Sequence, residues 1–218
     1  MSDSTVRVWD PFIRIFHWSL VAGFTLAWIS GEEEGVLHAY SGYAVGILIS
    51  LRLLWGFVGS KYARFSQFLY SPGEVIQYLK GLKRGKPDHY IGHNPAGSWM
   101  IFALLISLAM TTVSGLQVYG IEGHGPLADT QAGAPVVATY AGFIRDARAD
   151  SDEDEARGEH RENHEEHGAE EFWEEIHEFF ANLTLLLVFV HVAGVIVASR
   201  VHGENLVRAM VTGNRQKH

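Results

Sequence analysis

Four histidines in this 218-residue chain have the spacing that paired metal or haem ligands require. His177 and His191 lie 14 residues apart in one apolar stretch. Because 14 residues are close to four helical turns, both imidazoles project from nearly the same helix face, roughly 21 Å apart along the axis. His17 and His38 belong to two other apolar stretches. Ionisable side chains in such helices are costly in lipid and usually face a bundle interior, where they have a partner.

Depth in the membrane predicts which histidines pair. If successive helices cross in opposite directions, His17 lies at the level of His191 near the inner surface, and His38 lies at the level of His177 near the outer surface. Haem iron accepts two neutral imidazoles on opposite faces, and such a site needs no cysteine. The sequence therefore predicts two stacked b-type haems, one ligated by His17 and His191 and the other by His38 and His177. A single histidine near a helix end is often only interfacial, but agreement among four favours ligands.

Two glycines follow His38 on the same helix face. Gly42 and Gly46 stand four and eight residues after it. A glycine beside a macrocycle lets the backbone approach closely, so we expect both to line a haem. Small residues also serve plain helix–helix packing in membranes, which is the alternative interpretation.

Two arginines are candidates for pairing with haem propionates. Arg52 stands 14 residues after His38, which brings it to the level of the inner haem, and Arg14 is a second candidate. Either guanidinium would instead snorkel to the membrane surface if it had no partner. His93 and His202, at the inner ends of two helices, are candidates for lining a quinone pocket or bonding a propionate. The alternative for each is an interfacial histidine.

The elements that must position these side chains are four long stretches free of Asp, Glu, Lys and Arg, or nearly so. A bilayer core requires about 20 apolar residues in a helix. Four core helices of a soluble protein are the alternative, but soluble helices are rarely apolar on all sides. We therefore expect an all-α integral membrane four-helix bundle that forms a single domain over residues 1–218. Its helices are expected at about 13–31, 36–58, 95–119 and 173–199.

The composition excludes several kinds of site. The chain has no cysteine, which excludes disulfides, thiolate-held iron–sulfur clusters and covalent haem attachment. It has no phosphate-cradling glycine-rich loop and no nucleic-acid-binding pattern. No small-residue cleavage site follows the first apolar stretch, so we expect that stretch to remain as the first helix.

Basic residues predict the orientation. Short cytoplasmic loops are enriched in Lys and Arg. The N-terminal segment, the loop after the second helix and the C-terminal tail are basic, whereas "SGEEEG" and the 120–172 region are acidic. The chain is therefore expected to be a multi-pass protein of a bacterial inner membrane with both termini in the cytoplasm.

The basic loop contains a predicted surface helix. Ser71 and Glu74 form a capping box, and Pro72 suits the first helical position. We expect this helix to lie on the inner membrane surface through one apolar face. The same logic starts the third membrane helix with Asn94 as N-cap and Pro95 in its first turn. The predicted apolar face of the surface helix consists of Val75, Ile76, Leu79 and Leu82.

The acidic charge is concentrated in one segment. The chain has a net charge of −8, and residues 150–175 alone carry −11, within an expected periplasmic insertion at about 122–172. Such a surface would steer a basic c-type cytochrome to the outer haem. His160, His164 and His167 stand among glutamates in a pattern that permits weak binding of a divalent metal. A solvated charged helix or a disordered spacer is the more common structure for such a segment.

Several motifs resemble those of the bacterial cytochrome b561 family, which includes the b-type cytochrome subunits of membrane-bound nickel–iron hydrogenases. The matching stretches lie within residues 6–125 and 172–213, and the acidic stretch around 128–171 is outside them. The resemblance implies a di-haem bundle that passes electrons between a periplasmic redox protein and membrane quinone, with the same four histidine ligands. The stretches are "VRVWDPFIRIFHW", "LHAYSGYAVGILISLRLLWGFVG", "GHNPAGSWM", "IHEFFANLTLLLVFVHVAG" and "HGENLVRAMVTG".

Two other functions remain open at this point. A member of this family without a partner subunit would oxidise superoxide outside and reduce quinone, although an acidic outer surface repels an anion. Paired intramembrane histidines also occur in metal or proton transporters, and a purified protein without haem would favour that function.

Overall fold

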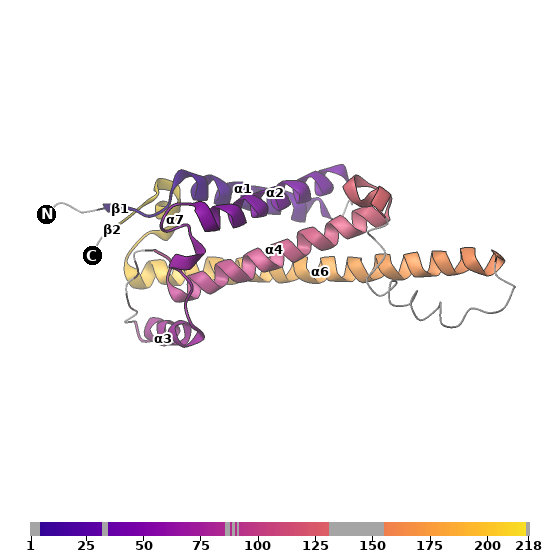
Figure 1. The fold of residues 1–218 in the computed structure, drawn as a ribbon. Coiled ribbons are helices and arrows are strands. Elements are labelled where there is room, and N and C mark those ends of the chain that lie inside the picture. Colours follow the sequence, from indigo (N-terminus) through magenta and orange to yellow (C-terminus); the bar gives the residue numbers. More distant parts are fainter. Residues whose placement is uncertain are drawn as a thin grey trace. The chain divides into compact units, whose positions relative to one another are not determined.

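The computed structural model describes residues 5–31, 35–85, 88, 90, 92–130 and 155–216, with side chains except at residues 5, 129, 130, 155–167 and 216. The chain is mainly helical, with two short strands and two short 3-10 helices (Figure 1). The strands are β1 (Thr5–Arg7) and β2 (Asn214–Gln216), and the 3-10 helices are η2 (Phe65–Gln67) and η3 (Gly125–Thr130). The α-helices are α1 (Pro11–Ile29), α2 (Val36–Val58), α3 (Pro72–Lys83), α4 (Pro95–Ile121), α6 (Glu155–His202) and α7 (Leu206–Thr212).

Four helices are long and apolar enough to cross a membrane: α1, α2, α4 and the Gly168–His202 part of α6. Few of their residues are buried inside the protein, and large apolar side chains such as Leu54 and Phe57 of α2 are exposed. Side chains of this kind are stable on a protein surface when that surface faces lipid. The prediction of an all-α, multi-pass membrane protein is confirmed.

Local capping explains where the first membrane helix begins. The Asp10 side chain accepts a hydrogen bond from the Ile13 amide at 2.8 Å, and Pro11 occupies the first turn. The second carboxylate oxygen of Asp10 accepts bonds from Trp55 Nε1 and the Ser60 hydroxyl. The helix therefore starts two residues before the predicted boundary, because Asp10 caps it and Pro11 suits its first turn.

The chain divides into two compact units, which are described separately. The first comprises Met1–Ala109 and Asn182–His218, and the second comprises Met110–Ala181. In the first unit α1 and α2 lie side by side (Figure 1). Its core includes Phe16, Val45 and Ile49, which pack with Leu105 and Leu108 of α4. The Ser107 and Thr184 hydroxyls, both buried, form a 2.7 Å hydrogen bond between α4 and α6 in this unit.

A two-stranded ribbon joins the ends of the described chain. Strands β1 and β2 are antiparallel, with Val6 opposite Arg215. The amides of Val8 and Trp9 both donate to the Gly213 carbonyl, at 2.9 and 3.1 Å. Gly213 ends α7 with φ 86°, and a Cβ at this position would lie 2.7 Å from the Trp9 carbonyl oxygen, so only glycine fits. Strands of three residues have no periodicity to predict, and the sequence did not indicate them.

The surface helix of the basic loop is confirmed as α3. Ser71 and Glu74 form the predicted capping box, and Pro72 is the first residue. The residue that α3 buries in the protein is Tyr78, at 3% exposure, while Ile76 and Leu79 on its predicted apolar face are exposed. The expectation that this face lies on a membrane therefore stays compatible with the fold.

Helix α6 is longer than predicted. It begins at Glu155 and not near residue 173, so the end of the expected acidic insertion is helical. Glutamate, alanine and arginine are strong helix formers, and extending a nucleated helix costs much less than starting one. The side chains of His160, His164 and His167 lie outside the described residues, as does the 131–154 segment.

Candidate functional site

The first unit brings His17 of α1 and His191 of α6 together. Both side chains are half-buried, and the two imidazoles are close enough to interact electrostatically. The His17 Nδ1 atom is buried and has no hydrogen-bond partner among the described residues. An unpaired buried donor or acceptor is costly, so this arrangement suits a bound group between the two rings.

Two guanidinium groups in the first unit also have unpaired buried nitrogens. Arg52, 4% exposed, lies over the Phe65 ring with 4.9 Å from Cζ to the ring centre. Its Nη1 has no hydrogen-bond partner among the described residues, and the same holds for Nε of Arg14. Buried cations need an anionic or hydrogen-bonding partner. The carboxylates of a cofactor would supply it.

His93 occupies an aromatic cage just before α4. Its ring lies 4.6 Å from that of Trp9 and 4.4 Å from that of Phe68, centre to centre, and its carbonyl accepts a bond from the Tyr70 hydroxyl. Burial, with Arg52 and Arg215 adding to it, lowers the pKa of His93 to about 3. The imidazole is therefore neutral at physiological pH, which is the form that bonds a propionate or a quinone oxygen without adding charge.

This lowered pKa predicts acid sensitivity. Between about pH 6.5 and pH 3 the unfolded chain binds a proton at His93 that the folded chain does not, so the free energy of unfolding falls as the pH falls through this window. We expect His93→Gln to flatten the decline in Tm between pH 7 and pH 4.5, measured by circular dichroism in detergent. His124→Asn, at an exposed histidine, is the control. Equal declines in wild type and His93→Gln would contradict the prediction.

The two glycines predicted to line a haem are placed on α2. A Cβ built on Gly42 meets no atom within 4 Å, so the described residues do not pack against it. Gly46 is half-buried, and its carbonyl accepts a bond from Ser50. The close approach between α1 and α2 lies instead at Gly23, whose Cβ would be 3.3 Å from Val45. Helix packing therefore does not account for Gly42.

His38 is held in a definite orientation within the first unit. Its Nδ1 lies 2.9 Å from the carbonyl oxygen of Ala27. A carbonyl only accepts, so Nδ1 carries the proton and the lone pair is on Nε2. Histidine ligands of metals typically use one ring nitrogen for the metal and donate the other N–H to a carbonyl or carboxylate.

His177 shows the same arrangement in the second unit. Its Nδ1 lies 2.9 Å from the Thr111 carbonyl oxygen and 3.4 Å from the Ser114 hydroxyl, both on α4. A Cβ on Gly115 would lie 2.8 Å from Cε1 of this imidazole. The lone pair of His177 is thus also on Nε2. His38 and His177 belong to different units.

Gly115 is predicted to be essential for the position of His177. A methyl group there would displace the ring from the Thr111 carbonyl, so Gly115→Ala should lower the occupancy of a haem bound by His177 to less than half. Gly194→Ala is the matched control, since a Cβ at Gly194 meets nothing within 4 Å. Reduced-minus-oxidised spectra of the two variants measure the effect, and full occupancy in Gly115→Ala would refute it.

The sequence did not indicate the acceptors of the two Nδ1–H groups or the role of Gly115. Backbone carbonyls carry no side-chain signal, and a serine–glycine pair in an apolar helix is common. The tertiary contact alone identifies them.

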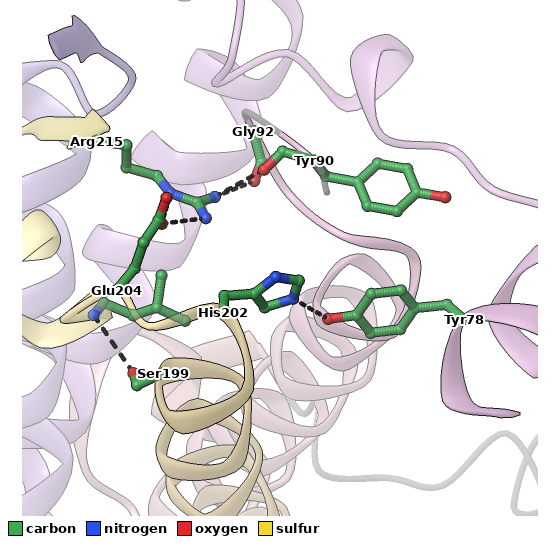
Figure 2. Close-up of polar contacts among 8 residues, drawn as sticks. Tyr78, Tyr90, Gly92, Ser199, His202, Glu204 and Arg215 are labelled. Atoms are coloured by element: carbon green, nitrogen blue, oxygen red, sulfur yellow. Dashed lines mark hydrogen bonds and ion pairs between the residues drawn. The ribbon is translucent and has the colours of Figure 1, made fainter. Parts of the chain in front are cut away.

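A buried ion pair lies near the C-terminus of the first unit (Figure 2). Arg215 donates to Glu204 from Nε at 2.9 Å and from Nη2 at 2.6 Å, and its Nη1 donates to the carbonyls of Tyr90 and Gly92, each at 3.0 Å. His202 lies with Nε2 3.3 Å from the Tyr78 hydroxyl. This network ties the C-terminal segment and α3 to the residues that precede His93.

Comparison with known proteins gives one family. The family model described as prokaryotic cytochrome b561 matches residues 8–213. Similar curated proteins include the probable Ni/Fe-hydrogenase B-type cytochrome subunit of Rhizobium leguminosarum bv. viciae, 26% identical over 153 residues, which are 56% of this chain and 62% of the relative. The probable Ni/Fe-hydrogenase 1 B-type cytochrome subunit of Escherichia coli K12 is 26% identical over 149 residues, covering 54% and 63%. The chain thus spans just over three fifths of these relatives. No solved structure matches it.

Proposed function

We propose that this chain, which belongs to the prokaryotic cytochrome b561 family, carries electrons across a bacterial inner membrane through two bis-histidine b haems. The electrons pass between a periplasmic redox protein and membrane quinone. The family implies haem b. When bound, each haem supplies an iron that takes up and gives up one electron.

The observation that carries this proposal is the hydrogen bond that His38 and His177 each make through Nδ1. In each, Nδ1 is bonded to a backbone carbonyl at 2.9 Å, which presents the Nε2 lone pair to a metal. A hydrogen bond of this kind fixes the tautomer and raises the basicity of the ligand. We infer that these two histidines hold the outer haem and that His17 and His191 hold the inner haem.

The remaining residues of the inner site fit a haem. Arg14 and Arg52 have unpaired buried nitrogens that the propionates of the inner haem would satisfy. Gly42 faces open space that a Cβ would fill, which suits a macrocycle beside α2. His93, neutral in its aromatic cage, offers one hydrogen bond to a propionate or to quinone. Together these residues bind and orient the cofactor and keep water from it.

The proposed orientation has both termini in the cytoplasm. It follows from the basic residues near the ends of the chain and in the loop that carries α3. The outer end of the membrane region then carries acidic side chains on α6, of which Glu171, Glu174, Glu175 and Glu178 are exposed.

The proposed partner is a periplasmic redox protein. The similar proteins are named as cytochrome subunits of Ni/Fe-hydrogenases, which supports a hydrogenase, and the acidic surface supports a basic c-type cytochrome. The salt dependence of the reduction rate tests the basic c-type cytochrome, because dissolved ions screen the attraction between a basic partner and the acidic surface. Reduction by a basic c-type cytochrome that does not slow between about 20 and 200 mM salt, over which the Debye length falls roughly threefold, would exclude electrostatic docking.

Transmembrane electron transfer is tested in proteoliposomes with ferricyanide trapped inside and dithionite added outside. The wild-type protein should bleach the internal ferricyanide, and His17→Ala and His38→Ala should each reduce the rate to that of empty vesicles, because each interrupts the path. Wild-type vesicles no faster than empty ones would overturn the proposal, and transport of metal ions by haem-free protein would favour a transporter instead.

A further inference from the structure

Two polar side chains in the second unit have buried atoms without a partner. Nε1 of Trp173 on α6 and Oε1 of Gln117 on α4 make no hydrogen bond to any described residue. The first atom is a donor and the second an acceptor. Native proteins rarely leave buried polar groups unpaired. A partner from outside the described residues is therefore expected where these two atoms lie.

The two residues lie within about one helical turn of the contact between His177 and α4. Trp173 precedes His177 by four residues, so the two side chains share one face of α6. Gln117 follows Ser114 by three residues on α4, and the Ser114 hydroxyl is 3.4 Å from the His177 Nδ1. The α4 and α6 segments of this unit run in opposite directions (Figure 1). Measured along the helix axes, Trp173 and Gln117 are thus displaced from His177 in the same direction. For Trp173 the displacement along α6 is about 6 Å.

The pair matches a carboxyl group. The oxygen of a carboxyl accepts from the indole N–H, and its hydroxyl donates to the amide oxygen. When the carboxyl is ionised, a turned amide presents its NH₂ group instead. Haem b carries two such groups at one edge. We propose that Trp173 and Gln117 bind a propionate of the haem ligated by His177. This inference rests on the proposed function, since it takes His177 as an iron ligand.

The charge of the second unit makes these neutral groups important. The described side chains of this unit include no lysine and no arginine. Several carboxylates lie there instead. The propionates of the inner haem have the cations Arg14 and Arg52 as proposed partners. The propionates of the outer haem depend on neutral hydrogen-bonding groups instead. The acidic residues described in the unit are Glu122, Glu170, Glu171, Glu174, Glu175 and Glu178.

The test compares Trp173→Phe and Gln117→Leu in protein that contains haem labelled with ¹³C at the propionate carboxyls. Reduced-minus-oxidised infrared spectra locate the labelled band directly. We expect that band to shift in both variants, and the outer haem to transfer to excess apomyoglobin roughly tenfold faster, as loss of one good hydrogen bond predicts. Trp28→Phe and Gln77→Leu, at exposed residues, are the matched controls and should leave both readouts unchanged.

The outcomes separate this inference from the proposed function. A labelled band at the wild-type position in both variants, with two haems still bound, would overturn the inference alone and leave an ordered water as the partner of the two atoms. Wild-type protein without haem would overturn both. If one variant fails to fold, the other decides the question by itself.

Discussion

Replacing His191 with alanine is expected to remove the inner haem and leave the outer one. If His17 and His191 hold this haem, the change removes one of its two histidine ligands, and neither Arg14 nor Arg52 can replace it, because a guanidinium stays protonated and has no lone pair for iron. A potentiometric titration of the wild type should resolve two one-electron components, and His191→Ala should show one. The remaining component should belong to the haem of His38 and His177.

Controls for this variant come from histidines outside the proposed ligand set. His202→Gln and His124→Asn should both retain two components, since His202 contacts Tyr78 and His124 stacks on Tyr119. His17→Ala should reproduce His191→Ala. Two unaltered components in His191→Ala would contradict the pairing, and loss of both in His202→Gln would indicate general unfolding.

Replacing Arg215 with alanine is expected to destabilise the first unit strongly. The Arg215 and Glu204 side chains are only 8% and 5% exposed, and the change would leave the carboxylate buried without its cation. Removing one partner of a buried ion pair typically costs about 3–5 kcal/mol. The carbonyls of Tyr90 and Gly92 would also lose their donor. Thermal unfolding in detergent, followed by circular dichroism, measures the loss.

Two further variants isolate the cause. Arg208→Ala removes an exposed arginine of α7 and should change stability by less than about 0.5 kcal/mol. Arg215→Met combined with Glu204→Gln should be more stable than Arg215→Ala, because no unpaired charge stays buried. If Arg215→Ala were as stable as Arg208→Ala, the ion pair would not anchor the C-terminal segment.

The membrane helices were predictable because their physical cause is local. A stretch of about 20 residues without charged side chains is visible in the sequence, because the hydrocarbon core of a bilayer requires that length of apolar helix. Caps are local as well. Ser71 with Glu74 starts α3, and the Asn94 side chain accepts from the Gly97 amide at 2.7 Å at the start of α4, as predicted. Asp10 acts in the same way on α1, whose start at Pro11 was predicted two residues late.

The parts that were not predictable depend on distant contacts. The ribbon of β1 and β2 joins residues more than 200 positions apart, and a three-residue strand carries no period. Gly115 matters only because the His177 ring lies against it. For the acidic part the sequence analysis left a charged helix and a disordered spacer open, and the structure continues α6 into it from the apolar segment.

The histidine pairs were predictable only in part. Their types and spacing were visible in the sequence, and the structure adds that His17 and His191 interact and that His38 and His177 each bond a carbonyl through Nδ1. Depth in the membrane predicts the pairing of all four histidines as haem ligands. What the sequence alone did not provide was the supporting shell of Ala27, Thr111 and Gly115.

The most direct test of the central claim is a haem count on the purified wild-type protein by the pyridine haemochromogen method. Two b-type haems per chain are predicted, one for each histidine pair, with one remaining in His38→Ala. A wild-type protein that is folded and contains no haem would contradict the proposed function. A count of one, unchanged in His38→Ala, would contradict the outer pair.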